Sequence, residues 1–372
     1  MNHLVMMIKK KLLMLALAAP IAQLEAMEPS NTLHLRAHRT EVVNLGNNEV
    51  TSLESHPEKD QLAYCYSCSE KKNNVHVWQS THPEYAIELV GHTDTVGAVT
   101  YCPGADQSGA ALLASGSADT TIKLWDIEHK SPIVTLSGHE KAVVALAYTR
   151  AHQLLASGSK DTTIRLWNLT TKEALLTLKG HTESVTSLAH IPESRLVSVS
   201  GDTTVKEWDL VTGKCLFELE LAPCEEALFS CQDIPNHVAC HPDGNLIAVA
   251  CECNDVQLFD NRTSKLTALL TGHENELSMS AFDPRGTYLA AADHSGMIKY
   301  WDIRSNSVHL DSKVSDLPVD VITYNAQGTT MYCAAKIFDA YTRSRGNATT
   351  SIVKLSTPEH VEQKNYMRCL IQ

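Results

Sequence analysis

The sequence has little basic charge, and several features of common site classes are missing. Acidic side chains outnumber basic ones by 43 to 31 over 372 residues, which leaves a formal net charge of -12. This balance argues against broad binding to nucleic acid or to an anionic membrane surface, because both draw on clustered Lys and Arg. After residue 26, no apolar run is long enough to span a bilayer. A glycine-rich phosphate loop, zinc-ligand spacing and paired carboxylates are also absent, so we expect no cofactor and no metal.

The cysteines do not form a recognisable framework. There are 11, an odd number. In an expected strand Cys65 and Cys68 point to opposite faces, which disfavours a disulfide or a metal site between them. Cys251 and Cys253 share a face but lack a second nearby pair that would complete a zinc site. We therefore expect most of these thiols to act as small buried hydrophobes, although some would pair if the chain is exported.

The first 26 residues differ from the rest of the chain. Lys9, Lys10 and Lys11 precede the apolar run 12–19, and small and polar residues follow up to Ala26. This order is typical of a secretory signal peptide, here spanning residues 1–26. It predicts a periplasmic or secreted protein if the signal is functional and a cytoplasmic protein otherwise. The alternatives are a disordered basic start or an unprocessed leader.

A unit of about forty residues repeats along the chain. Short alternating stretches such as "IKLWDI" and "IRLWNL" end in an aromatic residue in six copies, and a seventh, "SIVKLS" around Leu355, has lost the aromatic. The six aromatic residues are Trp78, Trp125, Trp167, Trp208, Phe259 and Trp301. A Gly-His pair precedes four of them, with its histidine at His92, His139, His181 and His273. Turn signals divide each unit into four short strands, which predicts a radial all-β fold.

The Gly-His and Trp-Asp markers resemble those of the WD40 repeat family over residues 32–357. The resemblance implies a seven-bladed β-propeller with four-stranded antiparallel blades, closed by a strand within residues 33–43, and leaves 358–372 as a C-terminal tail. Two units depart most from the pattern. The unit ending at Phe259 lacks the Gly-His pair, and the last unit predicts a long hairpin turning near Gly346 and Asn347.

Each of three successive units contains a His, a Ser and an Asp, the residue types of a hydrolytic triad. Ser lies ten residues and Asp six residues before the Trp in each case. A hydrolase needs one such constellation, so three copies favour a structural role. The resemblance implies hydrogen-bonded tetrads, namely His92, Ser115, Asp119 and Trp125; His139, Ser157, Asp161 and Trp167; and His181, Ser198, Asp202 and Trp208. After His273 the Asp at this offset is missing and Asp293 is shifted by two positions, so we expect that unit to be less rigid.

These patterns favour a non-enzymatic scaffold, a monomeric ring within a larger complex that presents its loops to a protein or peptide partner. Contacts are expected at the turns near Ala118, Lys160 and Gly201, with Lys160 as a candidate binding residue. An alternative from another class is an enzyme that uses the central channel, because fold alone does not exclude chemistry. Titratable side chains that converge on the channel would favour that alternative.

Three further residues raise separate hypotheses. Arg262 and Arg304 extend the marker to Asp-x-Arg, and the stretch around Arg304 resembles the box by which some WD40 proteins dock on cullin-type ubiquitin ligases. The alternative is a surface arginine at a blade end. Cys369 opens the final "CLIQ", which fits a prenylation box. The alternative for Cys369 is an ordinary tail thiol.

Overall fold

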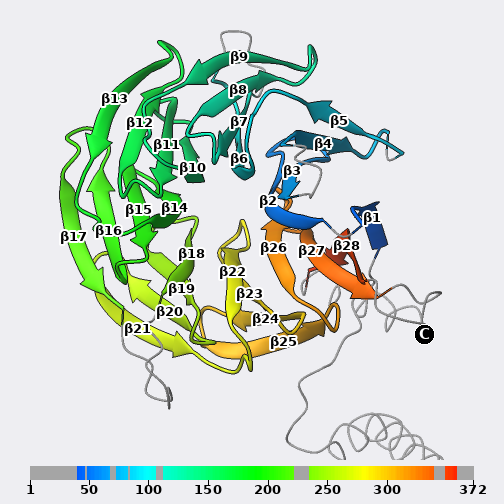
Figure 1. Ribbon diagram of the computed structural model, residues 1–372. Helices are drawn as coiled ribbons and strands as arrows, with labels where there is room; N and C mark the ends of the chain where they lie inside the picture. Colours follow the sequence, from blue (N-terminus) through cyan, green and yellow to red (C-terminus); the bar gives the residue numbers. More distant parts are fainter. Residues whose placement is uncertain are drawn as a thin grey trace, which may run out of the picture.

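The chain forms a ring of seven four-stranded antiparallel sheets (Figure 1). The computed structural model describes residues 40–46, 48–67, 73–82, 84–105, 112–221, 234–338 and 348–357. In this part of the chain every regular element is a β-strand. The prediction of an all-β, seven-bladed propeller is therefore confirmed.

Six sheets consist of four consecutive strands each, with the first strand nearest the centre of the ring (Figure 1). They are β2 (Glu49–Ser55), β3 (Gln61–Ser67), β4 (Val75–Gln79), β5 (Ala86–Leu89); β6 (Val96–Cys102), β7 (Leu112–Ser117), β8 (Ile122–Asp126), β9 (Ser131–Leu136); β10 (Val143–Thr149), β11 (Leu154–Ser159), β12 (Ile164–Asn168), β13 (Glu173–Leu178); β14 (Val185–Ile191), β15 (Arg195–Ser200), β16 (Thr204–Asp209), β17 (Cys215–Glu220); β18 (Pro235–Cys240), β19 (Leu246–Cys251), β20 (Val256–Asp260), β21 (Lys265–Leu270); and β22 (Leu277–Phe282), β23 (Tyr288–Asp293), β24 (Met297–Asp302), β25 (Ser307–Lys313).

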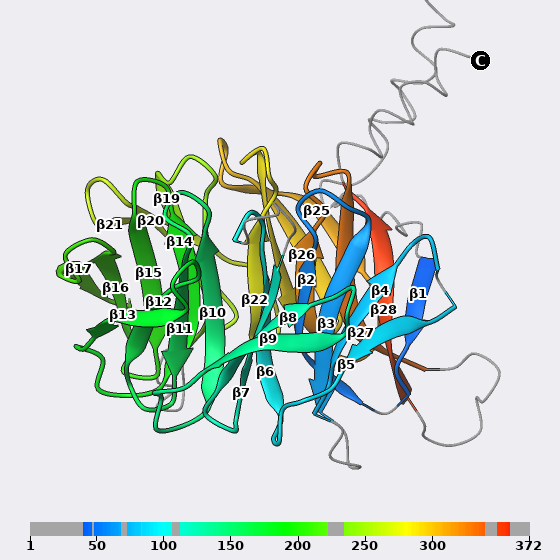
Figure 2. The same cartoon turned by 90° about the horizontal axis from the view of Figure 1, so that it is seen from above.

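The seventh sheet joins the two ends of the chain. It contains β26 (Val319–Tyr324), β27 (Thr330–Phe338), β28 (Ala348–Ser356) and, as its outermost strand, β1 (Thr40–Asn44). β1 lies antiparallel to β28, with Asn44 opposite Ser351. Figure 2 shows these two strands side by side in the wall of the ring. The predicted closure by a strand near the N-terminus is therefore confirmed.

The hydrophobic core lies between neighbouring sheets. Trp125 of the second sheet, for example, shares a buried cluster with Ala63, Val75 and Val77 of the first. The other aromatic marker residues likewise pack in clusters shared with the preceding sheet. Since each sheet covers the exposed face of its neighbour, a complete ring buries both faces of every sheet.

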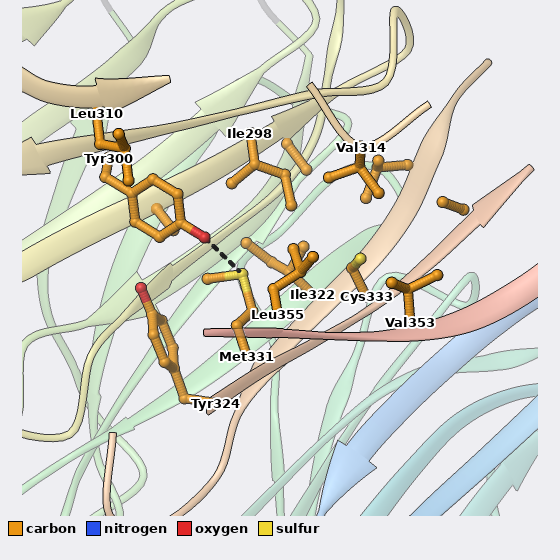
Figure 3. Close-up of a cluster of buried hydrophobic side chains, with 14 residues drawn as sticks. Ile298, Tyr300, Leu310, Val314, Ile322, Tyr324, Met331, Cys333, Val353 and Leu355 are labelled. Atoms are coloured by element: carbon orange, nitrogen blue, oxygen red, sulfur yellow. Dashed lines mark hydrogen bonds between the residues drawn. The ribbon is translucent and has the colours of Figure 1, made fainter. Parts of the chain in front are cut away.

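The core between the last two sheets lacks an aromatic marker residue, because the seventh unit has Leu355 at that position. Two tyrosines of this cluster, Tyr300 and Tyr324, are buried in its place. Figure 3 shows the Tyr300 hydroxyl directed at the Met331 sulfur, to which it donates a hydrogen bond at 3.5 Å. Two tyrosines and a flexible methionine thus fill a gap that Trp fills elsewhere.

Every innermost strand contains a β-bulge, and the seven bulged residues surround the channel. They are Thr51, Gly97, Val144, Thr186, Asn236, Ser278 and Asp320. Four of these side chains donate a hydrogen bond to the carbonyl that precedes the bulge in the next sheet, as Ser278 Oγ does to Val319 O at 2.6 Å. The bulges therefore link neighbouring sheets around the channel.

Several predicted features lie outside the described residues. These are the signal peptide 1–26, Cys68, the turn near Gly346 and Asn347, and the tail 358–372 with Cys369. The strands on either side of that turn, β27 and β28, pair as a hairpin from Thr330 opposite Ser356 to Phe338 opposite Ala348. The unit that ends at Phe259, which lacks a Gly-His pair, still forms four strands, β18–β21. Within the described ranges, no helix has the length and apolar character needed to cross a membrane.

Candidate functional site

The structure brings together all four residues of each predicted tetrad. In the sheet β10–β13, the Trp167 indole N–H donates to Ser157 Oγ at 2.8 Å. That oxygen lies 2.8 Å from His139 Nε2, and His139 Nδ1 lies 2.8 Å from Asp161 Oδ2. The corresponding distances around Trp125 and Trp208 fall between 2.7 and 2.9 Å. Each tetrad links the loop that enters a sheet to its second and third strands.

The protonation states in these tetrads follow from burial and hydrogen bonding. Burial lowers the pKa of the His139 imidazole more than Asp161 raises it. For Asp161, burial opposes ionisation, but hydrogen bonds from the Thr163 hydroxyl, the Glu140 N–H and His139 outweigh it and lower the pKa to about 2. A neutral imidazole therefore donates its Nδ1 proton to an ionised carboxylate, and the Ser157 hydroxyl donates to Nε2.

This geometry leaves the serine no capacity for nucleophilic attack. Ser115, Ser157 and Ser198 have no solvent-exposed surface. Each hydroxyl oxygen already accepts from an indole N–H, and its proton is directed at an imidazole. A nucleophile must reach a substrate carbonyl beside an oxyanion hole, which a fully buried hydroxyl cannot do.

The sheet β22–β25 contains a modified version of the tetrad. Asp293, two positions earlier than the aspartates of the other units, still reaches the histidine, with its Oδ2 2.6 Å from His273 Nδ1. Its other oxygen accepts from the Ser295 N–H and hydroxyl and from the Met297 N–H. The serine is replaced by Ala291, so His273 Nε2 is buried without a hydrogen-bond partner. The shift in sequence therefore does not separate His273 from Asp293, and what is missing is the hydroxyl.

The central channel contains a cavity of about 240 Å3 lined by residues of all seven innermost strands. Its titratable side chains are Glu54, His237 and Asp320. Burial is the main cause of each pKa shift, upward to about 7 for Glu54 and about 6 for Asp320 and downward to about 4 for His237. The three come from β2, β18 and β26, and among the described residues no group of three or more His, Cys, Asp or Glu could hold a metal ion. None of these three side chains contributes to the pKa shift of another, so the three do not form a coupled acid–base pair.

Comparisons with known proteins agree with this architecture. The family model described as "WD domain, G-beta repeat" matches residues 84–126, 130–168 and 172–209. A second model, described as "Nucleolar protein 10-like, N-terminal domain", matches residues 209–367 and is a β-propeller domain. The chain is a seven-bladed β-propeller that contains WD40 repeats. The first model covers the three units with complete tetrads, and the second covers the three units that follow them.

Several curated WD40 relatives share part of their sequence with this chain. It is 28% identical over 239 residues to the Periodic tryptophan protein 2 homolog of Dictyostelium discoideum, covering 64% of this chain and 20% of that protein. It is 27% identical over 285 residues to Pre-mRNA-processing factor 19 of Oryza sativa subsp. japonica, covering 75% and 43%. It is 31% identical over 100 residues to Target of rapamycin complex subunit wat1 of Schizosaccharomyces pombe, covering 26% and 32%. The chain spans less than half the length of these relatives.

The three candidate binding residues lie on two opposite faces of the WD40 ring. Lys160 is exposed in the turn between β11 and β12, on the same face as the Gly-His loops. Arg262 and Arg304 follow β20 and β24, in turns at the other end of their sheets, and their side chains are 75% and 79% exposed. Each arginine pairs with the Asp two residues before it, Asp260 at 4.0 Å and Asp302 at 3.5 Å. One contact surface therefore cannot contain all three.

The third strands of four WD40 units carry cations that are not among the candidates from the sequence. Lys123, Arg165, Lys206 and Lys299 each lie two residues before a marker Trp. Each is paired across the sheet with a residue of the outermost strand, which is Thr135, Thr177, Glu218 and Asp311 respectively. The regular spacing from the Trp was visible in the sequence, but the partners depend on strand register.

Proposed function

We propose that this WD40 propeller is a non-enzymatic scaffold that presents its loops to a protein or peptide partner. The observation that carries the proposal is the state of the serine hydroxyls in the His-Ser-Asp trios, which are buried and fully hydrogen-bonded. A rigid frame with exposed loops suits recognition, because loops on such a frame can vary without disturbing the fold. The titratable side chains that line the channel, Glu54, His237 and Asp320, do not perturb one another's pKa, which supports the same proposal.

We further propose that the ring acts as one copy within a larger assembly. Its relatives include a protein named as a subunit of the Target of rapamycin complex and one named as a pre-mRNA-processing factor. These names support an intracellular place for this chain rather than export. The propeller is proposed to span residues 32–357.

Affinity capture of the intact chain from its native source, read by mass spectrometry, tests the proposal. We expect partners that are retained by Arg304→Ala, on one face, and reduced by Lys160→Glu, on the face of the Gly-His loops. Capture of a cullin adaptor that depends on Arg304 would favour a ubiquitin-ligase receptor instead. Failure of the folded chain to retain any partner would overturn the scaffold proposal. Sequencing the mature N-terminus of the same sample tests the signal peptide.

A further inference from the structure

A second cavity lies on the face of the Gly-His loops, beside the outermost strand of the sheet β10–β13. Its volume is about 310 Å3. Two cations, Arg165 and Lys179, line it together with the hydroxyls of Thr163 and Thr177. Lys179 and Thr177 are exposed, whereas Arg165 is partly buried. The cavity therefore offers a cationic and hydrogen-bonding lining that a partner can reach from solvent.

Two other sheets show which chemical group pairs with the cation at the equivalent position. In the sheet β14–β17, Lys206 Nζ lies 2.5 Å from Glu218 Oε2, directly across from it on the outermost strand. In the sheet β22–β25, Lys299 Nζ lies 2.8 Å from Asp311 Oδ2 in the same arrangement. At two equivalent positions, the chain thus supplies its own carboxylate to the cation.

Arg165 has no such carboxylate. Its cross-strand neighbour is Thr177, and within the described ranges it makes no ion pair. Its Nε is buried without a hydrogen-bond partner. By contrast, Lys123, whose neighbour is also a threonine, donates to Thr135 Oγ1 at 2.9 Å. The Nε atom is enclosed by the protein, but Arg165 as a whole is partly exposed and lines the cavity, and a carboxylate matches a guanidinium in both charge and shape.

We propose that this cavity binds a carboxylate side chain of a protein partner, an Asp or a Glu, in the place that Glu218 and Asp311 occupy in their own sheets. Lys179 provides a second positive charge, and the threonine hydroxyls provide further donors. The proposal rests on the proposed scaffold function and names the chemistry of one contact.

Two acidic residues also line the cavity, and they have different effects. The Asp161 carboxylate is occupied, since it accepts hydrogen bonds from His139, the Thr163 hydroxyl and two backbone N–H groups. Glu140 is exposed, and in the part of the chain that the structure describes it makes no ion pair with Arg165. Glu140 would repel an incoming carboxylate, so Glu140→Gln should strengthen binding.

The test uses the intact chain and a short peptide of glutamates with blocked ends, titrated at low salt and followed by NMR of arginine side-chain N–H groups. Wild type should bind weakly with a shift of the Arg165 signal, and the matching glutamine peptide should not. Thr177→Glu places a carboxylate opposite Arg165, as Glu218 lies opposite Lys206 in the neighbouring sheet. This variant should fold and should bind the peptide at least tenfold more weakly than wild type. Arg165→Gln should have the same effect, whereas Lys206→Gln, whose charge is already neutralised, should leave binding unchanged.

Equal peptide binding by wild type and Thr177→Glu would overturn the proposal. So would binding of inorganic phosphate at Arg165 without binding of the glutamate peptide, because that result would assign the cavity to phosphate. The titration is independent of partner capture. Captured partners that bind wild type and Thr177→Glu equally would leave the scaffold function standing and remove this site. A folded chain that binds the peptide but captures no partner would support this site and remove the scaffold function.

Discussion

At the scale of single residues, the repeated His-Ser-Asp trios act on stability. Each buried indole N–H and hydroxyl has a partner within its tetrad. A buried polar group without a partner costs about 1–3 kcal/mol, so the four residues stabilise one another in a place where water cannot reach them. Repetition at constant offsets from Trp125, Trp167 and Trp208 made this arrangement predictable from sequence.

Removing one tetrad carboxylate tests this role. Asp161→Ala should lower the free energy of unfolding by about 1–3 kcal/mol, because His139 Nδ1 and the Thr163 hydroxyl lose their acceptor. Urea unfolding of both proteins measures the difference. The control is Asp316→Ala, in an exposed pair with Lys313, which should change stability by under ~0.5 kcal/mol. Unchanged stability together with loss of a hydrolytic activity would contradict the structural role.

The incomplete tetrad of the sheet β22–β25 allows a stabilising substitution. Ala291→Ser places a hydroxyl at the position that Ser115 and Ser157 hold, and it should satisfy His273 Nε2. The expected gain in thermal unfolding experiments is about 0.5–1.5 kcal/mol, the net value of one hydrogen bond. Ala290→Ser, a buried neighbour whose side chain points to the opposite face of the strand, should destabilise instead. A loss of stability in Ala291→Ser would show that the site cannot accept the hydroxyl.

At the scale of strands, the bulges on the innermost strands decide how neighbouring sheets are joined. At four junctions between neighbouring sheets, a bulged residue donates a hydrogen bond from its hydroxyl or amide group to a carbonyl of the next sheet. The bulged residues Gly97 and Val144 have no side-chain donor. The seventh bulged residue, Asp320, lies at the junction between the last sheet and the first. Its Oδ2 is buried without a hydrogen-bond partner, and burial raises its pKa to about 6. An ionised carboxylate cannot donate to a carbonyl, so this junction is weaker at neutral pH.

Asp320 should therefore make stability depend on pH. Because the pKa is higher in the folded protein than its ordinary value of 3.8, folding favours the protonated form. The contribution is fully present below about pH 4 and is lost as pH rises through about 6. Asp320→Ser introduces a hydroxyl at this bulge, as Ser278 has at its own bulge. This variant should be more stable than wild type near pH 7 by on the order of 1–2 kcal/mol, after allowance for the solvent contact of Asp320.

Urea unfolding near pH 4.5 and near pH 7 measures this effect. The charged groups that face Asp320 are Lys336, which lowers its pKa, Glu49, which raises it, and His294, which lowers it. Ser278→Ala is the matched control at another junction and should destabilise equally at both pH values, because it removes a neutral hydrogen bond. A pH-independent difference between Asp320→Ser and wild type would contradict the assignment.

At the scale of the whole molecule, each sheet depends on both neighbours, and the ring is closed by one short strand. The clusters that contain the marker aromatics are each shared between two sheets, so no sheet buries its core alone. β1 completes the seventh sheet, and Val42 and Val43 contribute to the cluster between the last sheet and the first. Closure should therefore stabilise the entire ring rather than one sheet.

Truncation tests the importance of closure. A chain that begins at residue 46 lacks β1 and exposes the edge of β28, so it should unfold at lower temperature and show faster amide exchange in β28. A chain that begins at residue 32 retains β1 and should match the full-length protein in both measurements. If the two truncated chains behave alike, the strand contributes little to the ring.

The repeat, the all-β class, the number of blades and the members of the three tetrads can all be predicted from the amino-acid sequence. These features are periodic and local, since alternation sets the strands and a constant offset from the Trp sets the polar partners. The partner that each polar group meets across a junction between sheets is set when the strands pair and the sheets pack. Asp293 reaches His273 from a shifted position, and Asp320 stands where four other junctions have a hydrogen-bond donor. Arg165 faces Thr177, whereas Lys206 and Lys299 face carboxylates. Such pairings depend on strand register and on neighbouring sheets, and no local pattern encodes either.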